Sequence, residues 1–152
     1  MKVTFAHTNL VAKDWVRLAQ FYVDVFQCEL KLPERDISGD WLDNVTALHD
    51  AHITGAHLIL PGYDRNGTGP TLELFQYTEI EPNEIKSANK EGFSHIAFAV
   101  DDVAECSALI IKHGGGLVGE IVNADIDGVG KINFAYAHDP EGNIVEIQKW
   151  DM

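Results

Sequence analysis

Apolar and polar residues alternate near the start of the chain and then take a helical spacing. Residues 3–11 alternate strictly, with Phe5 and His7 on one face, and this period predicts a strand. Apolar residues then recur three, four and seven positions apart over residues 15–26, as on one face of a helix. Asp14 precedes them at the position of an N-terminal cap. The first 26 residues therefore predict a strand followed by an amphipathic helix.

This strand and helix pattern occurs twice. Phe5-Ala6-His7 matches Phe93-Ser94-His95, and the same shift of 88 residues aligns Asp14 with Asp102. Later, Glu73 and Glu146 occupy matching apolar strands at a shift of 73 residues, so the first copy is longer in its middle. Glycines 114–116 are expected to end the second helix, which Asp101 or Asp102 begins. The repeat predicts two modules, each with a strand, a helix and about three further strands.

The predicted organisation is one α+β domain over residues 1–152. Module one covers residues 1–77, a linker rich in glutamate covers 78–92, and module two covers 93–152. We expect the sheets of both βαβββ modules to contribute to a single site. Further strands are expected at residues 56–60 and 71–77 in module one, and at 117–122, 131–137 and 144–150 in module two. Residues 33–54 and 61–70 lack periodicity and are interpreted as loops, the second alternatively as a disordered hairpin tip.

Composition narrows the class of partner. Eleven Lys and Arg stand against 24 Asp and Glu, and the net charge of −13 repels phosphate backbones and anionic lipid headgroups. No apolar run is long enough to cross a membrane, and the start of the chain lacks the pattern of a signal peptide. Cys28 and Cys106 are not closely spaced and are interpreted as reduced structural thiols. We expect a cytoplasmic protein with a small-molecule substrate and neither nucleic acid nor membrane as partner.

Four residues at repeated positions suggest a metal site. His7 and His95 lie on the strand faces opposite the predicted helices, and Glu73 and Glu146 interrupt otherwise apolar strands. A single histidine or glutamate in a strand usually has a structural or solvated role. Buried carboxylates without a partner are costly, however. If the two modules pack about a pseudo-twofold axis, residues at equivalent repeat positions gather at that axis. Two imidazoles and two carboxylates suit one divalent transition metal, with Ni, Co, Zn, Fe and Mn all open.

The chemistry of such a site favours proton transfer at carbon. A neutral shell of two histidines and two glutamates on an octahedral ion leaves two positions for a substrate with neighbouring oxygens. Deprotonation of that substrate would give a metal-stabilised enediolate. The repeat makes Glu146 and Glu73 chemically alike, so both are candidates for the base. Glu146 is our first choice and Glu73 the second.

Several motifs resemble one known family. The segments around His7 and Glu73, the run from Phe93 to Asp102 and above all the turn and strand at residues 138–147 resemble the vicinal oxygen chelate superfamily of glyoxalases, bleomycin resistance proteins and extradiol dioxygenases. The resemblance covers nearly the whole chain. It implies paired βαβββ modules that form a cupped mixed sheet around a metal site, and it implies a homodimer. It also implies that His7, Glu73, His95 and Glu146 are the metal ligands of a lyase or isomerase similar to lactoylglutathione lyase or an epimerase.

Two other functions stay open. An extradiol-type dioxygenase needs three open metal positions, against which a fourth protein ligand argues. A non-catalytic, drug-sequestering protein would grip a flat ligand between aromatic side chains, for which Trp41, Tyr63, Phe75, Tyr77 and Trp150 are candidates. His49 and His52 are left unassigned, and His57 and His138 are expected to have structural, hydrogen-bonded roles.

Overall fold

The chain forms two compact units, each with its own sheet and its own helix. The structure, a computed structural model, describes residues 1–64, 66, 68–82 and 86–151. The first unit covers Met1–Pro82 and the second Asn83–Met152. None of the helices in the described ranges has the length and apolar character that crossing a membrane requires.

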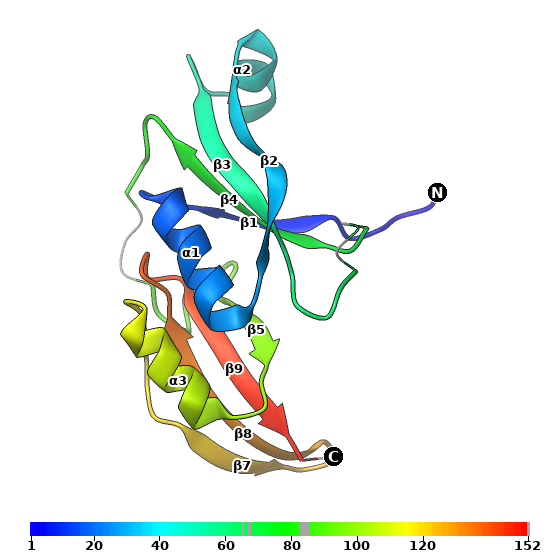
Figure 1. Cartoon of the computed structure of the whole chain (residues 1–152), viewed down its shortest axis with the longest axis vertical. Helices are drawn as coiled ribbons and strands as arrows, with labels where there is room; N and C mark the ends of the chain where they lie inside the picture. The colour runs from blue at the N-terminus through cyan, green and yellow to red at the C-terminus, as the bar shows by residue number, and fades with distance from the viewer. Residues whose placement is uncertain (65, 67, 83–85, 152) are drawn as a thin grey trace. The chain divides into compact units, whose positions relative to one another are not determined.

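The first unit is a four-stranded mixed sheet with a helix on one face (Figure 1). Its elements are β1 (His7–Val11), α1 (Trp15–Phe26), β2 (Glu29–Ser38), α2 (Asp40–Thr46), β3 (His52–Ile59) and β4 (Thr71–Tyr77). The strand order is β1-β4-β3-β2. Strand β1 pairs with β4 in parallel, and the other pairs are antiparallel.

Helix α1 forms where the sequence places its cap and its apolar stripe. The Asp14 carboxylate accepts a hydrogen bond from the backbone N–H of Arg17, which satisfies one of the free donors of the first turn. Leu18 and Tyr22, on the apolar face of α1, are fully buried, and the sheet contributes buried residues such as Leu58 to the same core. Burying one such side chain contributes about 1.5–3 kcal/mol.

The second unit repeats this architecture. Its elements are β5 (His95–Ala99), α3 (Val103–Lys112), β6 (Gly116–Leu117), β7 (Val122–Ile126), β8 (Gly130–His138) and β9 (Ile144–Trp150). Strand β5 pairs with β9 in parallel and β9 with β8 antiparallel. Strands β6 and β7 pair with successive parts of β8, as one interrupted strand would. The predicted α+β class and its two βαβββ modules are therefore confirmed.

The start and the end of α3 also follow from particular residues. Of the two candidate caps, Asp102 is the one whose carboxylate accepts from the backbone N–H of Glu105. Gly114 follows the helix with φ +92°, a backbone conformation that favours glycine. At Gly115 a Cβ atom would lie 2.3 Å from the carbonyl oxygen of His138, so the helix end packs against β8 only because that atom is absent.

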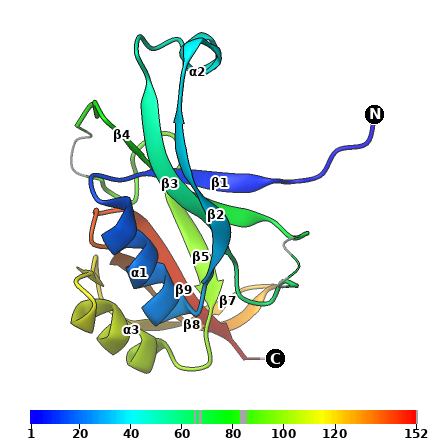
Figure 2. The same ribbon diagram turned by 45° about the horizontal axis from the view of Figure 1, so that its top comes forward.

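Two sequence predictions of local structure were wrong. Residues 33–54 were expected to form a loop, but they contain most of β2, helix α2 and the start of β3. In β2 the apolar Leu30 and Leu32 are exposed and the polar Glu29, Lys31 and Arg35 are half-buried, so no buried apolar face marks the strand. Helix α2 is too short to show a helical period. Figure 2 shows α2 at the far end of the long β2–β3 pair, where its Leu42 packs with Ala51 and Ile53. The strand expected at 117–122 is paired only at Leu117 and resumes at Val122.

The expected linker contains no helix in its described parts, residues 78–82 and 86–92. Residues 83–85 of that linker and residues 65 and 67 of the loop expected at 61–70 lie outside the described residues. By contrast, β4 and β9 have the bounds that their alternating residues predicted, 71–77 and 144–150.

Candidate metal centre

The strand register places one cluster of polar side chains on the sheet of each unit. In the first unit Asn9, Glu73 and His57 are direct neighbours across β1, β4 and β3, so their side chains share one face. With His7, they are called here the first half-site. In the second unit the same register brings Ala97, Glu146 and Tyr136 side by side on β5, β9 and β8. His95, Glu146 and Tyr136 form the second half-site.

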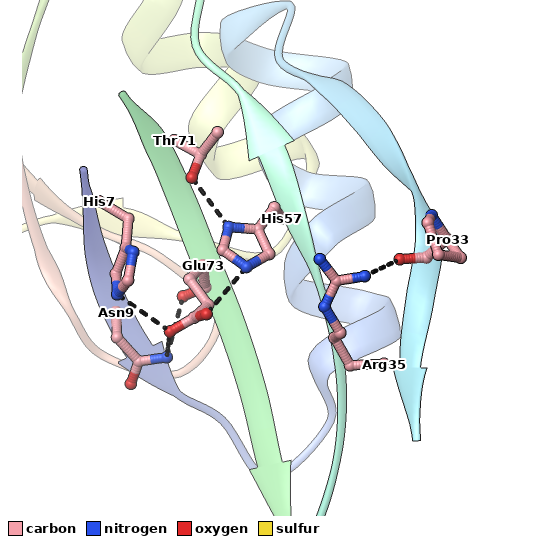
Figure 3. Close-up of polar contacts among 7 residues, drawn as sticks. All are labelled: His7, Asn9, Pro33, Arg35, His57, Thr71 and Glu73. Atoms are coloured by element: carbon pink, nitrogen blue, oxygen red, sulfur yellow. Dashed lines mark hydrogen bonds and ion pairs between the residues drawn. The ribbon is translucent and has the colours of Figure 1, made fainter. Parts of the chain in front are cut away.

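Glu73 lies at the centre of the first half-site (Figure 3). Its Oε2 atom is 3.5 Å from Nε2 of His7 and accepts a hydrogen bond of 2.9 Å from Nδ2 of Asn9. Its Oε1 atom is 2.9 Å from Nε2 of His57. Glu73 is only 8% exposed, so these side chains replace the water that a carboxylate would otherwise bind.

His57 is held from both sides of its ring. While Nε2 faces Glu73, Nδ1 lies 2.8 Å from Oγ1 of Thr71. Burial lowers the pKa of His57 below its usual range, and the positive charge of Arg35 lowers it further, although Glu73 acts in the opposite direction. The imidazole is therefore neutral at neutral pH. The Arg35 guanidinium itself turns toward the carbonyl of Pro33 (Figure 3).

The second half-site is simpler. Oε2 of Glu146 is 3.0 Å from Nε2 of His95. The ring of Tyr136 lies against that of His95, with ring centres 5.0 Å apart. Glu146 is half-buried, whereas Glu73 is buried.

The structure thus brings the predicted site residues together in two pairs. His7 meets Glu73 within the first unit, and His95 meets Glu146 within the second. That the two pairs share one metal ion stays a prediction.

The sequence predicted a hydrogen-bonded, structural role for His57, and its ring nitrogens do have partners, but the sequence did not place it beside Glu73. Its position opposite Glu73 depends on the register of the β3–β4 pair, and the loop at residues 61–70 that joins these strands is too long for the two-residue hairpin turns that fix a register. A histidine in a predicted strand, one strand away from a buried glutamate, was the available signal.

The other candidate histidines have separate partners. His49 pairs with Asp50, and Nε2 of His52 lies 2.6 Å from Oδ1 of Asp36, so these two histidines do not form a ligand pair. Nδ1 of His138 faces the backbone carbonyl of Asp139, a structural contact of the kind expected for it.

The aromatic residues considered for a drug-binding cleft have different surroundings. Trp41 is exposed on α2, and Tyr63 is exposed with its ring against Gly69. Phe75 and Tyr77 pack against the small core around Leu42. Nε1 of Trp150, in the second unit, donates to the side chain of Gln148.

The donor atoms of the first half-site fit a divalent metal. One ligand atom from each of His7, His57 and Glu73 lies within 4.8 Å of the others. Imidazole nitrogen and carboxylate oxygen are the donors that borderline transition metals prefer. A buried carboxylate that faces two imidazoles is also a place where a cation would relieve uncompensated negative charge.

Comparison with known proteins gave consistent findings. The sequence profile of the Glyoxalase/Bleomycin resistance protein/Dioxygenase superfamily matches residues 4–147. No curated protein sequence matches the chain.

Among solved structures, a glyoxalase family protein from Bacillus cereus is similar with a TM-score of 0.83 and 20% identity, covering 99% of this chain and 95% of that one. A variant of glyoxalase I from Zea mays has a TM-score of 0.65 and 26% identity, covering 95% of this chain and 43% of that one. The trypanothione-dependent glyoxalase I of Leishmania major has a TM-score of 0.65 and 24% identity, covering 97% of this chain and 87% of that one.

Proposed function

Because the chain belongs to the Glyoxalase/Bleomycin resistance protein/Dioxygenase superfamily, we propose that it is a metal-dependent lyase or isomerase. Its reaction would be proton transfer at a carbon beside a carbonyl, in a small substrate with two neighbouring oxygens. The observation that carries this proposal is the recurrence of one histidine–glutamate pair, at matching register positions, in both units.

The proposed metal ligands are His7, Glu73, His95 and Glu146. Two neutral imidazoles and two carboxylates balance the charge of a divalent ion such as Ni, Co, Zn, Fe or Mn. When bound, such an ion would stabilise the negative charge that develops on the substrate oxygens as the carbon-bound proton leaves.

Glu146 is the proposed base. A base must leave one carboxylate oxygen free to approach the carbon-bound proton. Glu73 has contacts on both oxygens, with His57 on Oε1 and with Asn9 and His7 on Oε2. Glu146 contacts His95 through Oε2, and within the described part of the chain no hydrogen bond or ion pair involves its Oε1 atom.

Solvent deuterium exchange tests this reaction. The metal-loaded protein would be incubated in D₂O with an α-hydroxy-ketone, a methylglyoxal–thiol adduct and an acyl-CoA, with metal-stripped protein as the control. We expect metal-dependent incorporation of deuterium into one of these classes, abolished in Glu146→Gln. Absence of exchange with all three would contradict the proposal.

An extradiol-type dioxygenase is the second candidate, and one observation favours it. His7, His57 and Glu73 are two histidines and one carboxylate, the ligand set of many non-haem iron oxygenases. Consumption of dioxygen with catechols by the iron-loaded protein, without deuterium exchange, would support this candidate over the first.

Drug sequestration is a weaker candidate, because Phe75 and Tyr77 are already packed in a small core. Tight binding of an aromatic drug to the metal-free protein would support it.

The setting of the reaction is also proposed. We propose a homodimer in the cytoplasm, acting on a small molecule. The two free, buried cysteines, Cys28 and Cys106, and the net charge of −13 support a reducing compartment and a soluble assembly.

A further inference from the structure

The surroundings of the two glutamates are not equivalent, although the repeat makes their positions equivalent. Opposite Glu73 on the neighbouring antiparallel strand stands His57, whereas opposite Glu146 stands Tyr136. Since both glutamates face a histidine of the parallel strand, His57 is a difference between the half-sites rather than part of their shared pattern.

The other neighbour of each glutamate differs in the same direction. Asn9, on the parallel strand beside Glu73, donates to Oε2, while the corresponding residue beside Glu146 is Ala97, which has no polar side chain. Among the residues that the structure describes, Glu73 is therefore restrained by two hydrogen-bonding side chains that have no equivalent at Glu146.

A chain of two hydrogen bonds runs from Thr71 through His57 to Glu73, and the donor and acceptor of each can be assigned. In a neutral imidazole one ring nitrogen donates and the other accepts. A carboxylate only accepts, so Nε2 of His57 is the donor to Oε1 of Glu73 at 2.9 Å. Nδ1 must then accept, and the Thr71 hydroxyl, 2.8 Å away, is its donor.

We propose that His57 is a positioning residue for Glu73, holding Oε1 so that Oε2 is the single oxygen presented to the metal and to His7. The proposal rests on the proposed function, since it assigns how Glu73 would act as a ligand there. It also gives His57 a role distinct from that of a metal ligand.

The distances on the two carboxylate oxygens differ as this role requires. The 2.9 Å separation of Oε1 from His57 is that of a hydrogen bond. The 3.5 Å separation of Oε2 from Nε2 of His7 is long for a hydrogen bond. It is the spacing of two ligand atoms that each lie roughly 2.1 Å from a common ion, which are about 3 to 4 Å apart.

A consequence concerns the division of roles between the glutamates. A carboxylate held on one oxygen by His57 and on the other by Asn9 cannot swing toward a substrate. Glu73 is thereby fixed as a ligand, and the base must come from the less restrained second half-site.

The tautomer of His57 in the metal-free full-length protein is the first test. Long-range ¹H–¹⁵N NMR correlations distinguish imidazoles protonated at Nε2 from those protonated at Nδ1, and His57→Gln identifies the signal. We expect protonation at Nε2. Protonation at Nδ1 would overturn the proposal, because His57 would then offer Nε2 as a lone pair for a metal.

Titration with Co²⁺ is the second test, with the wild type, His57→Gln and His57→Leu compared. Glutamine places an N–H near the position of Nε2, so we expect its affinity to stay within about threefold of wild type and its cobalt absorption spectrum to be unchanged. Leucine removes the donor, and the affinity should fall about 10- to 100-fold, as is typical when a partner of a metal ligand is lost. Circular dichroism checks that both variants are folded.

The outcomes separate this inference from the proposed function. If His57→Gln loses affinity as severely as His7→Ala and its cobalt spectrum changes, then His57 is a ligand and the positioning role is wrong. If His57→Leu binds like the wild type, the positioning role is also wrong. Failure of the proposed function looks different, since the wild type itself would then bind no Co²⁺ whatever the tautomer of His57.

Discussion

At the scale of single residues, burial governs the chemistry of the ionisable groups. Glu73 is buried, and two imidazoles and an amide surround its carboxylate in place of water. Burial also acts on the two cysteines, whose ionisation it suppresses. Burial raises the pKa of the Cys28 thiol to about 12, and burial together with the nearby Glu105 raises that of Cys106 to about 11.

The cysteines should therefore be slow to react in the folded protein. The thiolate is the reactive form, and at pH 8 both thiols are far below their raised pKa values and shielded from solvent. We expect a thiol reagent at pH 8 to label neither cysteine in the time in which it labels both in denaturant. Mass spectrometry counts the labels, and rapid labelling of one thiol in the native protein would contradict this expectation.

Residue-scale prediction from sequence succeeded where a residue's role depends on its own strand. Alternation placed His7 and His95 on the strand faces away from the helices, and each of them there meets the glutamate of the neighbouring parallel strand. The partner of His57 was not predicted, because its contact with Glu73 depends on the register between two strands, and alternation within one strand carries no information about its neighbour.

At the scale of elements, the two helices begin at equivalent caps. Asp14 and Asp102 each accept from the backbone N–H three residues later, while Asp101 stands one position outside the second cap. Replacing Asp14 or Asp102 by Ala should cost about 0.5–2 kcal/mol each. The melting temperature should fall by roughly 2–4 °C per kcal/mol, and Asp101→Ala is the matched control that leaves it unchanged. A drop with Asp101→Ala as large as with Asp102→Ala would contradict the assignment of the cap.

The core beneath α1 should be sensitive to cavities. Leu58 on β3 is fully buried, whereas Leu32 on β2 is 71% exposed. Leu58→Ala should lower the free energy of unfolding by about 2–5 kcal/mol, and Leu32→Ala should change it by less than about 0.5 kcal/mol. Denaturation with urea measures both. Equal losses would show that this packing does not support the first unit as described.

Prediction of elements from sequence worked where the alternation or helical spacing of apolar residues was strong, and failed where it was weak. The alternation of apolar and polar residues gave β4 and β9 their correct bounds, and the apolar stripe after Asp14 gave those of α1. Strand β2 was missed because its Leu30 and Leu32 are exposed, so no buried face imposes a clear alternation on it.

At the scale of the whole molecule, the repeat explains why each unit carries the same pair of residues. Both sheets run one strand with a histidine parallel to one with a glutamate, and the register brings the two side chains together. The sequence repeat was sufficient to predict this duplication. It could not predict α2, which lies between β2 and β3, because the corresponding connection of the second unit, between β7 and β8, has no helix.

We expect the protein to assemble as a homodimer. Large apolar side chains such as Val3, Phe5 and Phe93 are exposed, and covering them would favour association. Sedimentation equilibrium should give about twice the chain mass of 16.8 kDa. A monomer mass that is independent of concentration would contradict this prediction.

The central claim is that one divalent metal is held by residues of both units, and metal titration of the stripped full-length protein tests it most directly. Wild type should bind one Co²⁺ or Ni²⁺ per chain, and His7→Ala, His95→Ala and Glu146→Gln should each reduce the affinity by about 100-fold or more, while the control His138→Ala binds normally. Since His7 and His95 belong to different units, equal losses would indicate a shared site. Undiminished stoichiometric binding in His95→Ala and Glu146→Gln would contradict the account.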